Sequence, residues 1–224
     1  MKRNILTLSA AVLMLGFISV LQAGEMKPQR FNLDLWGNGL STVNGHFSNT
    51  VKSMDFLQTG ASFGIAWQYF PIRSVGIQAG YELSWQNVDK QFRNEANKTP
   101  AFVVHQITLS GLYNFANVME STARFRPYVG AGIGLYPFRL TDDGVSGNVV
   151  KQSNGNKFEK TSFGLNGNAG IEFRATDHLS IFGGARYHYL FAKDNDKFGS
   201  DSGFGNQGLL SYGLGLAYHF PFGR

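Results

Sequence analysis

The segment from Leu210 to Phe220 alternates between large apolar residues and small or polar ones. Leucine, tyrosine and phenylalanine occupy every second position, and serine, glycine, alanine and histidine lie between them. Because successive side chains of a β-strand point to opposite faces, this pattern predicts a strand with one apolar and one nearly bare face. A closed membrane barrel suits that asymmetry, since lipid lies outside it and a narrow lumen inside.

The same alternation recurs seven more times along the chain. The predicted strands cover Phe31–Trp36, Ala61–Tyr69, Val75–Gln86, Gln106–Phe115, Tyr128–Tyr136, Phe163–Arg174, Leu179–Tyr189 and Leu210–Phe220. Most of them have the length of roughly 9–11 residues that a strand needs to cross a bilayer. The pattern therefore predicts an all-β protein, an eight-stranded antiparallel up-and-down transmembrane β-barrel.

A soluble eight-stranded barrel is the alternative architecture. Its outer face would not need to be so apolar. It would also not need aromatic residues such as Trp67, Trp85 and Tyr113 near the strand ends, where the aromatic girdles of membrane barrels lie. The membrane barrel is therefore the favoured interpretation.

The first 23 residues form the one helical-type apolar run. Lys2 and Arg3 provide a positive start, Ile5–Leu21 an apolar centre and Ala23 a small residue suited to cleavage. This order is typical of a secretory signal peptide. We expect residues 1–23 to be that peptide and residues 24–224 to be one barrel domain.

The connections between the predicted strands alternate in length. The long ones are Ser41–Asp55, Asn87–Pro100, Arg139–Lys160 and Ala192–Gln207. Bacterial outer-membrane barrels have long outer loops and short periplasmic turns. We therefore expect four mobile extracellular loops, periplasmic termini and a location in the outer membrane of a Gram-negative cell.

Three segments carry a family resemblance. Arg126–Tyr136, Gly170–Phe173 and His178–Tyr187 resemble successive strands of the OmpA/OmpX-like outer-membrane β-barrel superfamily, a group of porin-like small barrels. Tyr218-x-Phe220 is similar to the terminal aromatic signal that this superfamily presents to the barrel-assembly machinery. The resemblance implies outer-membrane lipids, lipopolysaccharide and that machinery as partners. It implies architecture rather than activity, because the superfamily includes adhesins, complement-evasion proteins, small channels and lipid A enzymes.

Charge and cysteine content exclude several classes of function. The formal net charge of +5 is too mild to indicate nucleic-acid binding, and the sequence has no basic cluster or aromatic-basic motif. The absence of cysteine excludes disulfides and thiol chemistry. No histidine pair has the spacing of metal ligands. We therefore expect no nucleic-acid partner, no metal and no cofactor.

The sharpest catalytic candidate is His46-Phe-Ser48-Asn49. Its spacing resembles the His-x-Ser-Asn motif of lipid A 3-O-deacylases, in which an imidazole activates a serine hydroxyl. In that family the motif lies late in the chain with a downstream glutamate, whereas here it lies in the first loop and no glutamate follows before Glu82. Asp194–Gly199 similarly echoes a calcium loop, but Phe198 replaces an oxygen ligand. We interpret both segments as ordinary solvated loops.

The inward positions of the predicted strands carry both signs of charge. The expected lumen network consists of Glu82, Gln106, Arg126, Glu172, Arg174, Arg186 and His188. Glu82 and Arg186 lie on the third and seventh strands, which face each other in an eight-strand ring. We expect them to pair directly or through Gln106 and to block the lumen, because an unpaired buried charge is costly. The alternative is a wet lumen with separately solvated charges.

These observations predict a non-enzymatic outer-membrane barrel. Its role is then structural, or it binds an extracellular ligand through the four long loops. A small-solute channel is the alternative from a different class, and a lipid A 3-O-deacylase-like enzyme is the third possibility. Loop sequences encode specificity without general motifs, so the ligand is not readable from them.

Overall fold

The computed structural model describes residues 30–72, 74–93, 95, 97–115, 124–152, 155–199 and 203–220. The predicted signal peptide, residues 1–23, and the residues after Phe220 lie outside these ranges. Within the described part of the chain, no helix is both long enough and apolar enough to cross a membrane.

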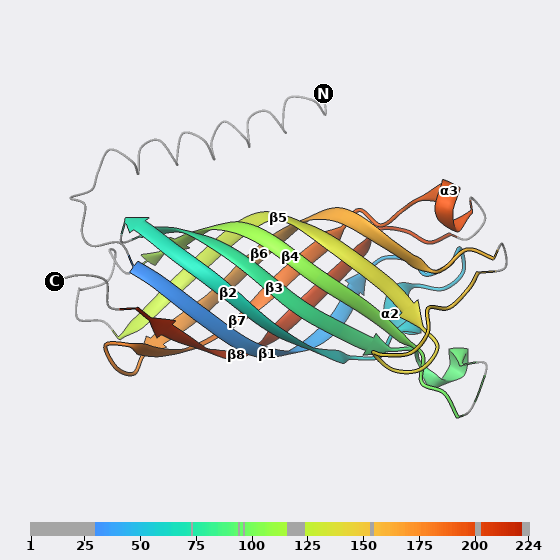
Figure 1. Ribbon diagram of the computed structural model, residues 1–224, viewed down its shortest axis with the longest axis horizontal. Helices are drawn as coiled ribbons and strands as arrows, with labels where there is room; N and C mark the ends of the chain where they lie inside the picture. Colours follow the sequence, from blue (N-terminus) through green and yellow to red (C-terminus); the bar gives the residue numbers. More distant parts are fainter. Residues whose placement is uncertain are drawn as a thin grey trace, which may run out of the picture.

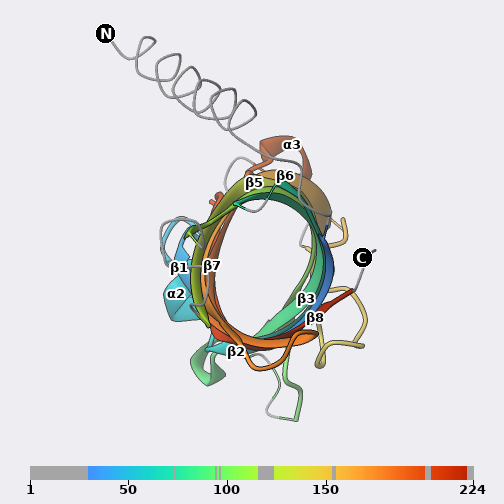
Figure 2. The same ribbon diagram turned by 90° about the vertical axis from the view of Figure 1, so that its left-hand side faces the viewer.

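Eight antiparallel strands form one closed barrel (Figures 1 and 2). The strands are β1 (Arg30–Asn44), β2 (Gly60–Ile72), β3 (Val75–Asn87), β4 (Ala101–Asn114), β5 (Phe125–Thr141), β6 (Glu159–Arg174), β7 (Leu179–Leu190) and β8 (Gln207–His219). Each strand pairs with its neighbour in sequence, and β8 pairs with β1, with Leu35 opposite Leu216. The predicted fold class is confirmed, and no strand edge is left open.

The strands are longer than the alternation predicted. They contain from 12 residues in β7 to 17 residues in β5. β1 continues to Asn44 and β5 to Thr141, into segments that we expected to be loop. About ten residues suffice to cross a bilayer, so the barrel extends beyond the membrane on the side of the long connections. We call this side the loop end and the opposite side the turn end (Figure 1).

The predicted faces of the strands are confirmed. Outward residues stay accessible in the isolated barrel, as Leu214 (68%) and Phe63 (62%) illustrate. Inward residues such as Ser62, Gln106 and Ser211 are completely buried. The outer wall is therefore apolar and the lumen is polar, as a barrel in lipid requires.

Two inward glycines make room for large aromatic side chains. A Cβ added at Gly64 would lie 2.2 Å from the ring of Trp36, and one at Gly134 would lie 2.8 Å from the hydroxyl of Tyr136. Real Cβ atoms do not approach neighbours so closely, so any larger residue would displace the ring. The small residues of the inner face therefore leave the space that a few bulky side chains need to cross the lumen.

The loop end of the barrel is closed by an apolar cluster, which we call the cap. It includes inward strand residues and residues from all four long loops: Leu40, Leu57, Val88, Phe102, Val104, Tyr136, Phe138, Leu140, Leu190, Ala192, Phe198, Phe204 and Leu209, with Phe47, Phe56, Phe92, Val150 and Phe158 packed against them. Three short helical turns carry part of the cap: α2 (Ser53–Phe56), η1 (Lys90–Phe92) and α3 (Asn195–Phe198). The loops thus share one core with the upper lumen.

Phe47 lies at the centre of the cap. Its ring centroid is 4.1 Å from that of Phe56 in the same loop, 5.4 Å from that of Phe158 and 5.3 Å from that of Phe204. It also meets Phe102 of β4 edge to face at 5.8 Å. Aromatic pairs at these separations contribute about 0.5–1.5 kcal/mol beyond the area that they bury. One side chain therefore ties the first, third and fourth long loops to the barrel wall.

Our expectation of four mobile, solvated loops is wrong for the parts of the loops that pack in the cap. The physical reason is that each loop places aromatic or aliphatic side chains over the open end of the barrel, where they cover one another from water. The sequence pattern missed this because the residues have no regular spacing. The loops form a structured platform on the barrel.

We predict that Phe47→Ala loosens this platform. A buried phenylalanine costs about 3–5 kcal/mol when it is truncated to alanine, and the partial exposure of Phe47 lowers this to about 2–3 kcal/mol. Because about 1.4 kcal/mol corresponds to a factor of ten, protease cleavage within the loops should become at least about tenfold faster. Limited proteolysis of the refolded barrel measures this rate.

Met54→Ala is the matched control, because Met54 lies in α2 of the same loop but is 52% exposed. It should leave the cleavage rate unchanged. Equal rates for the wild type and Phe47→Ala would show that the cap does not hold the loops.

Candidate functional site

A charged pair crosses the middle of the lumen. Nη1 of Arg186 on β7 lies 3.8 Å from Oε2 of Glu82 on β3. The side chain of Glu82 is 3% exposed and that of Arg186 is 13% exposed. β3 and β7 are opposite in the closed strand order, so the pair spans the barrel instead of joining neighbouring strands.

Trp36 on β1 contacts both members of the pair. Its Nε1 donates a hydrogen bond of 2.9 Å to Oε2 of Glu82. The guanidinium carbon of Arg186 lies 3.6 Å from the centroid of the Trp36 ring. A desolvated cation–π contact contributes about 2 kcal/mol, and removing one partner of a buried ion pair costs about 3–5 kcal/mol. The three side chains therefore hold one another across the lumen and fill it at this level.

A second polar layer lies closer to the turn end, around Asp34. Oδ2 of Asp34 accepts hydrogen bonds from Nε2 of Gln68 at 2.5 Å and from Nε2 of Gln78 at 3.4 Å. A cavity of about 20 Å³ lies between Asp34, Tyr128 and Glu172. Such a volume holds about one water molecule. The layer is a packed network with room for isolated water.

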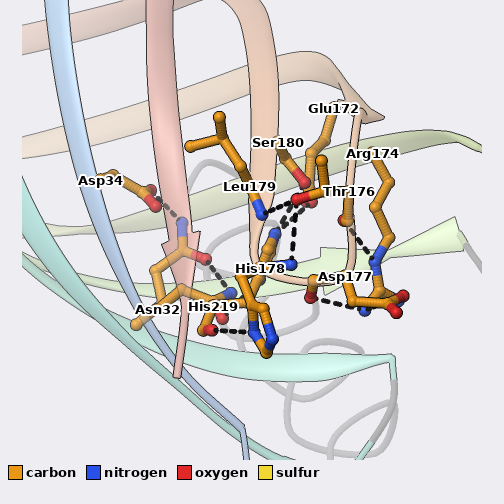
Figure 3. Close-up of polar contacts among 11 residues, drawn as sticks. Asn32, Asp34, Glu172, Arg174, Thr176, Asp177, His178, Leu179, Ser180 and His219 are labelled. Carbon is orange, nitrogen blue, oxygen red and sulfur yellow. Dashed lines mark hydrogen bonds and ion pairs between the residues drawn. The ribbon is translucent and has the colours of Figure 1, made fainter. Parts of the chain in front are cut away.

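His219 is the centre of the same layer at the turn end (Figure 3). Its Nδ1 lies 2.7 Å from Oδ1 of Asn32, and its Nε2 lies 2.7 Å from Oγ of Ser180. The same Nε2 is 3.1 Å from Oε1 of Glu172. Because Oδ1 of Asn32 only accepts, Nδ1 of His219 donates the proton. The imidazole thereby connects β1, β6 and β7 through side chains.

Tyr136 and His188 form the boundary between the polar lumen and the cap. Tyr136 is completely buried, and its hydroxyl lies 3.2 Å from Nδ1 of His188. Below them, Ser110 donates a hydrogen bond of 2.7 Å to Oδ1 of Asn166. The chemistry of the lumen thus changes from ionic to apolar along its axis.

The structure divides the seven expected network residues between the middle of the lumen and the turn end. Glu82 and Arg186 are in direct contact, and Gln106 does not bridge them, because its Nε2 donates to Oγ of Ser84 at 2.9 Å. His188 contacts Tyr136 above the pair.

The other three expected residues lie nearer the turn end. Glu172 contacts His219 and is opposite Arg126 in the β5–β6 register. Arg174 is apart from the network: its guanidinium donates to the carbonyl oxygens of Thr176 and Asp177 in the turn after β6 (Figure 3). Its position at the end of β6 puts it at the rim instead of inside.

Sequence reasoning left out two side chains that organise the site, Trp36 and Tyr136. Both occupy inward positions in the alternation, and this was the available signal. A large aromatic residue on the otherwise small and polar face marks a position where the side chain must cross the lumen. Gly64, opposite Trp36 on β2, and Gly134, two residues before Tyr136 on β5, provide the space.

The His46–Ser48 motif does not form a catalytic pair in this structure. Oγ of Ser48 accepts hydrogen bonds from the backbone nitrogens of Val51 at 3.1 Å and of Thr50 at 3.4 Å. Among the hydrogen bonds of the described residues, none joins His46 to Ser48, and His46 is exposed. The serine hydroxyl stabilises a turn of the first loop. In the described ranges, no three His, Asp or Glu side chains are grouped to hold a metal ion.

We predict that Arg186→Ala destabilises the barrel or opens it to ions. The substitution leaves Glu82 buried without its cation, which costs about 3–5 kcal/mol. Planar-bilayer recordings and urea unfolding in lipid vesicles measure the two effects. The wild type should show little steady conductance.

Arg174→Ala removes the same charge at the rim and should not change conductance, and the loss of its contacts to the turn should destabilise the barrel less than Arg186→Ala does. A wild type that conducts steadily, and to the same degree after Arg186→Ala, would contradict the view that the ion pair blocks the lumen.

Comparison with known proteins agrees with this architecture. The profile of the family described as outer membrane protein beta-barrel domain matches residues 10–220. A search of curated protein sequences finds no match.

Solved structures of the same fold share little sequence with the chain. Neisserial surface protein A is 16% identical with a TM-score of 0.53, over 86% of this chain and 97% of that one. AlkL, determined in lipid bilayers, is 15% identical with a TM-score of 0.53, over 90% and 95% of the two chains. Ail of Yersinia pestis, solved with the heparin analogue sucrose octasulfate, is 11% identical with a TM-score of 0.51, over 87% and 100%. These likenesses show the fold.

The closed eight-strand barrel, its apolar outer wall and the match of the family profile over nearly the whole chain lead to one conclusion. The protein belongs to the outer membrane protein β-barrel domain family and is located in the outer membrane of a Gram-negative cell.

Proposed function

We propose that this protein is a non-enzymatic outer-membrane barrel that binds an extracellular partner through its four long loops. The observation that carries the proposal is the cap, in which Phe47 packs against aromatic residues of the other loops. Loops that share a core present their outer residues in a fixed arrangement. A fixed arrangement lowers the conformational entropy that binding would otherwise cost.

The filled lumen supports binding over transport. The pair of Glu82 and Arg186, the network around Asp34 and the cap occupy three successive levels of the barrel. An eight-stranded barrel has an interior just wide enough for side chains to fill it. A small-solute channel would require these levels to rearrange together.

The charge of the loops favours a partner without strong net charge. The loop segments 45–59, 88–100, 142–158 and 191–206 contain eight Lys or Arg and eight Asp or Glu residues. A balanced surface produces little long-range attraction for a polyanion such as the heparin analogue bound by Ail. Recognition then depends on local hydrogen bonds and apolar contacts, as at a protein or neutral glycan interface.

We predict that the loop end faces the exterior of the cell. The chain has no cysteine, so a single introduced cysteine is a clean probe. Cysteines at Asn49 and Asn97 should react with a membrane-impermeant maleimide on intact cells, because both residues are exposed in long loops. A cysteine at Thr176, which is exposed at the turn end, should react only after the outer membrane is opened. The reverse pattern would invert the orientation.

We predict that the exposed surface shared by the first two loops contributes to binding. α2 and η1 are adjacent, since the ring of Phe56 lies 5.3 Å from that of Phe92. Met54 and Lys90 are exposed on these two turns and outside the cap. Cells that express the wild type should bind a component of glycan and matrix-protein arrays, and Met54→Asp with Lys90→Asp should weaken this at least about tenfold.

Thr176→Asp at the turn end is the control and should bind as the wild type does. Equal binding by cells with and without the protein, over the whole array, would argue against a surface-binding role. The enzyme alternative has its own measurement: lipid A should have the same mass in cells with the wild type and with His46→Ala combined with Ser48→Ala.

A further inference from the structure

A hollow of about 320 Å³ lies on the barrel at its loop end, where β4, β5, β6 and α3 meet. His105, Arg139 and Thr161 line it from the three strands, and Lys197 lines it from α3. None of these residues takes part in the lumen network or in the loop surface discussed above. The hollow therefore has a separate location and a separate chemistry.

Pro137 explains why the wall is hollowed at this place. The β4–β5 pairing runs from Val104 opposite Phe138 to Ile107 opposite Leu135, and the two positions between them are unpaired. Proline has no backbone N–H, so it cannot complete the ladder toward β4. Pro137 itself lines the hollow.

The strand pattern places the hollow on the outer face. Arg139 has the same parity along β5 as the exposed, outward residues Ile133 and Leu135. His105 shares parity on β4 with Ile107, which is 50% exposed, and Thr161 shares parity on β6 with Phe163. These side chains therefore point toward the membrane side of the wall.

The height of the hollow matches the level of lipid headgroups. The apolar outward residues of β5 begin at Phe125 and end at Leu135. Ten steps of about 3.3 Å on a strand tilted by about 40° span roughly 25 Å, the height of the apolar band of membrane barrels. Pro137 and Arg139 come next along β5, so they lie where the hydrocarbon ends.

A row of apolar side chains lies directly beneath the hollow. Ile107, Leu135 and Phe163 are opposite one another in the β4–β5 and β5–β6 registers. All three are about half exposed in the isolated barrel. Such a row provides a surface for acyl chains immediately below the polar site.

The polar lining is mainly cationic. Arg139, Lys160 and Lys197 line the hollow together with the carboxylate of Glu159. Nη2 of Arg139 donates a hydrogen bond of 3.1 Å to the carbonyl oxygen of Val145. Among the described residues, neither Arg139 nor Lys197 has an ion-pair partner within 4 Å. Both side chains thus retain donors for an anion.

Lys197 is held at the hollow by the anchoring of α3. Oδ1 of Asp194 accepts a hydrogen bond of 3.1 Å from the backbone nitrogen of Lys197. Oδ2 of the same carboxylate forms an ion pair with Nζ of Lys160, also at 3.1 Å. Both contacts lower the pKa of the Asp194 carboxyl, and the backbone hydrogen bond has the larger effect, so the carboxyl stays charged. Phe198, the last residue of α3, is buried in the cap.

We propose that this hollow binds the phosphate of a lipid in the outer leaflet, with its acyl chains lying along Ile107, Leu135 and Phe163. Arginine and lysine are the side chains that proteins use for phosphate, and arginine adds directed donors. Basic pockets at the level of the headgroups bind phosphorylated lipids by this combination. The inference depends on the outward orientation of the loop end and not on the existence of a loop partner.

The test is native mass spectrometry of the refolded wild-type barrel in detergent, with bisphosphorylated lipid A added in the presence of a chelator of divalent cations. Arg139→Gln combined with Lys197→Gln should reduce the bound fraction at least tenfold. The charge-matched control is Lys151→Gln with Lys157→Gln, two exposed lysines of the third long loop, which should bind as the wild type does. Lys197→Gln alone should give a smaller but clear loss, and it serves if the double variant does not fold, because its side chain has no structural hydrogen bond among the described residues.

Two further arms identify the source of the phosphate. Dephosphorylated lipid A should bind at least tenfold more weakly than the bisphosphorylated form, and millimolar inorganic phosphate should not displace the lipid. Displacement by inorganic phosphate would mean a free-anion site and would overturn the lipid assignment. Equal losses in the test and control variants, or no loss in either, would overturn the site. Loss of lipid binding with loop-partner binding intact, or the reverse, separates this inference from the proposed function.

Discussion

The closed ring of eight strands is the constraint on which the rest of this structure depends. Closure pairs the backbone groups between neighbouring strands and leaves no open edge, which the interior of a bilayer requires. It also limits the lumen to a width that side chains fill. Every bulky inward residue therefore needs small residues facing it, as Gly64 faces Trp36. Every buried charge needs a partner within the ring, as Glu82 has Arg186.

The lumen is filled by two different kinds of chemistry because its two parts have different surroundings. Within the membrane-spanning part, the outer face must be apolar, so polar side chains concentrate inside, where Glu82 pairs with Arg186 and Asp34 with Gln68. At the loop end the strands extend past the bilayer, and the surrounding medium is water. There the apolar side chains turn inward and build the cap, as they do in a soluble protein. The loops gain their order from this second core.

The residues of the outer wall also change where the surroundings change from lipid to water. On β5 the apolar residues end at Leu135, and Pro137 and Arg139 follow. The interrupted β4–β5 pairing, the cationic side chains and the anchored turn α3 coincide at this height. A cationic site above an apolar row is complementary to an amphipathic lipid, which has a polar headgroup above apolar acyl chains. We propose that both places serve interaction: the loop platform faces water, and the hollow faces the membrane boundary.

The amino-acid sequence by itself determined the strands, their faces and the closed-barrel class, because alternation with period two is a local property of an extended chain. It also determined that Trp36, Glu82, Arg186 and His188 point inward. It predicted that Glu82 and Arg186 pair, but not whether they pair directly or through Gln106, since this depends on strand register and on position across the ring. Tertiary structure alone decided that Glu82 contacts Arg186 without Gln106 between them, and that Arg174 binds a turn at the rim. It also decided the cap, because Phe47, Phe158 and Phe204 lie in loops without periodicity, and only the closed end of the barrel brings them together.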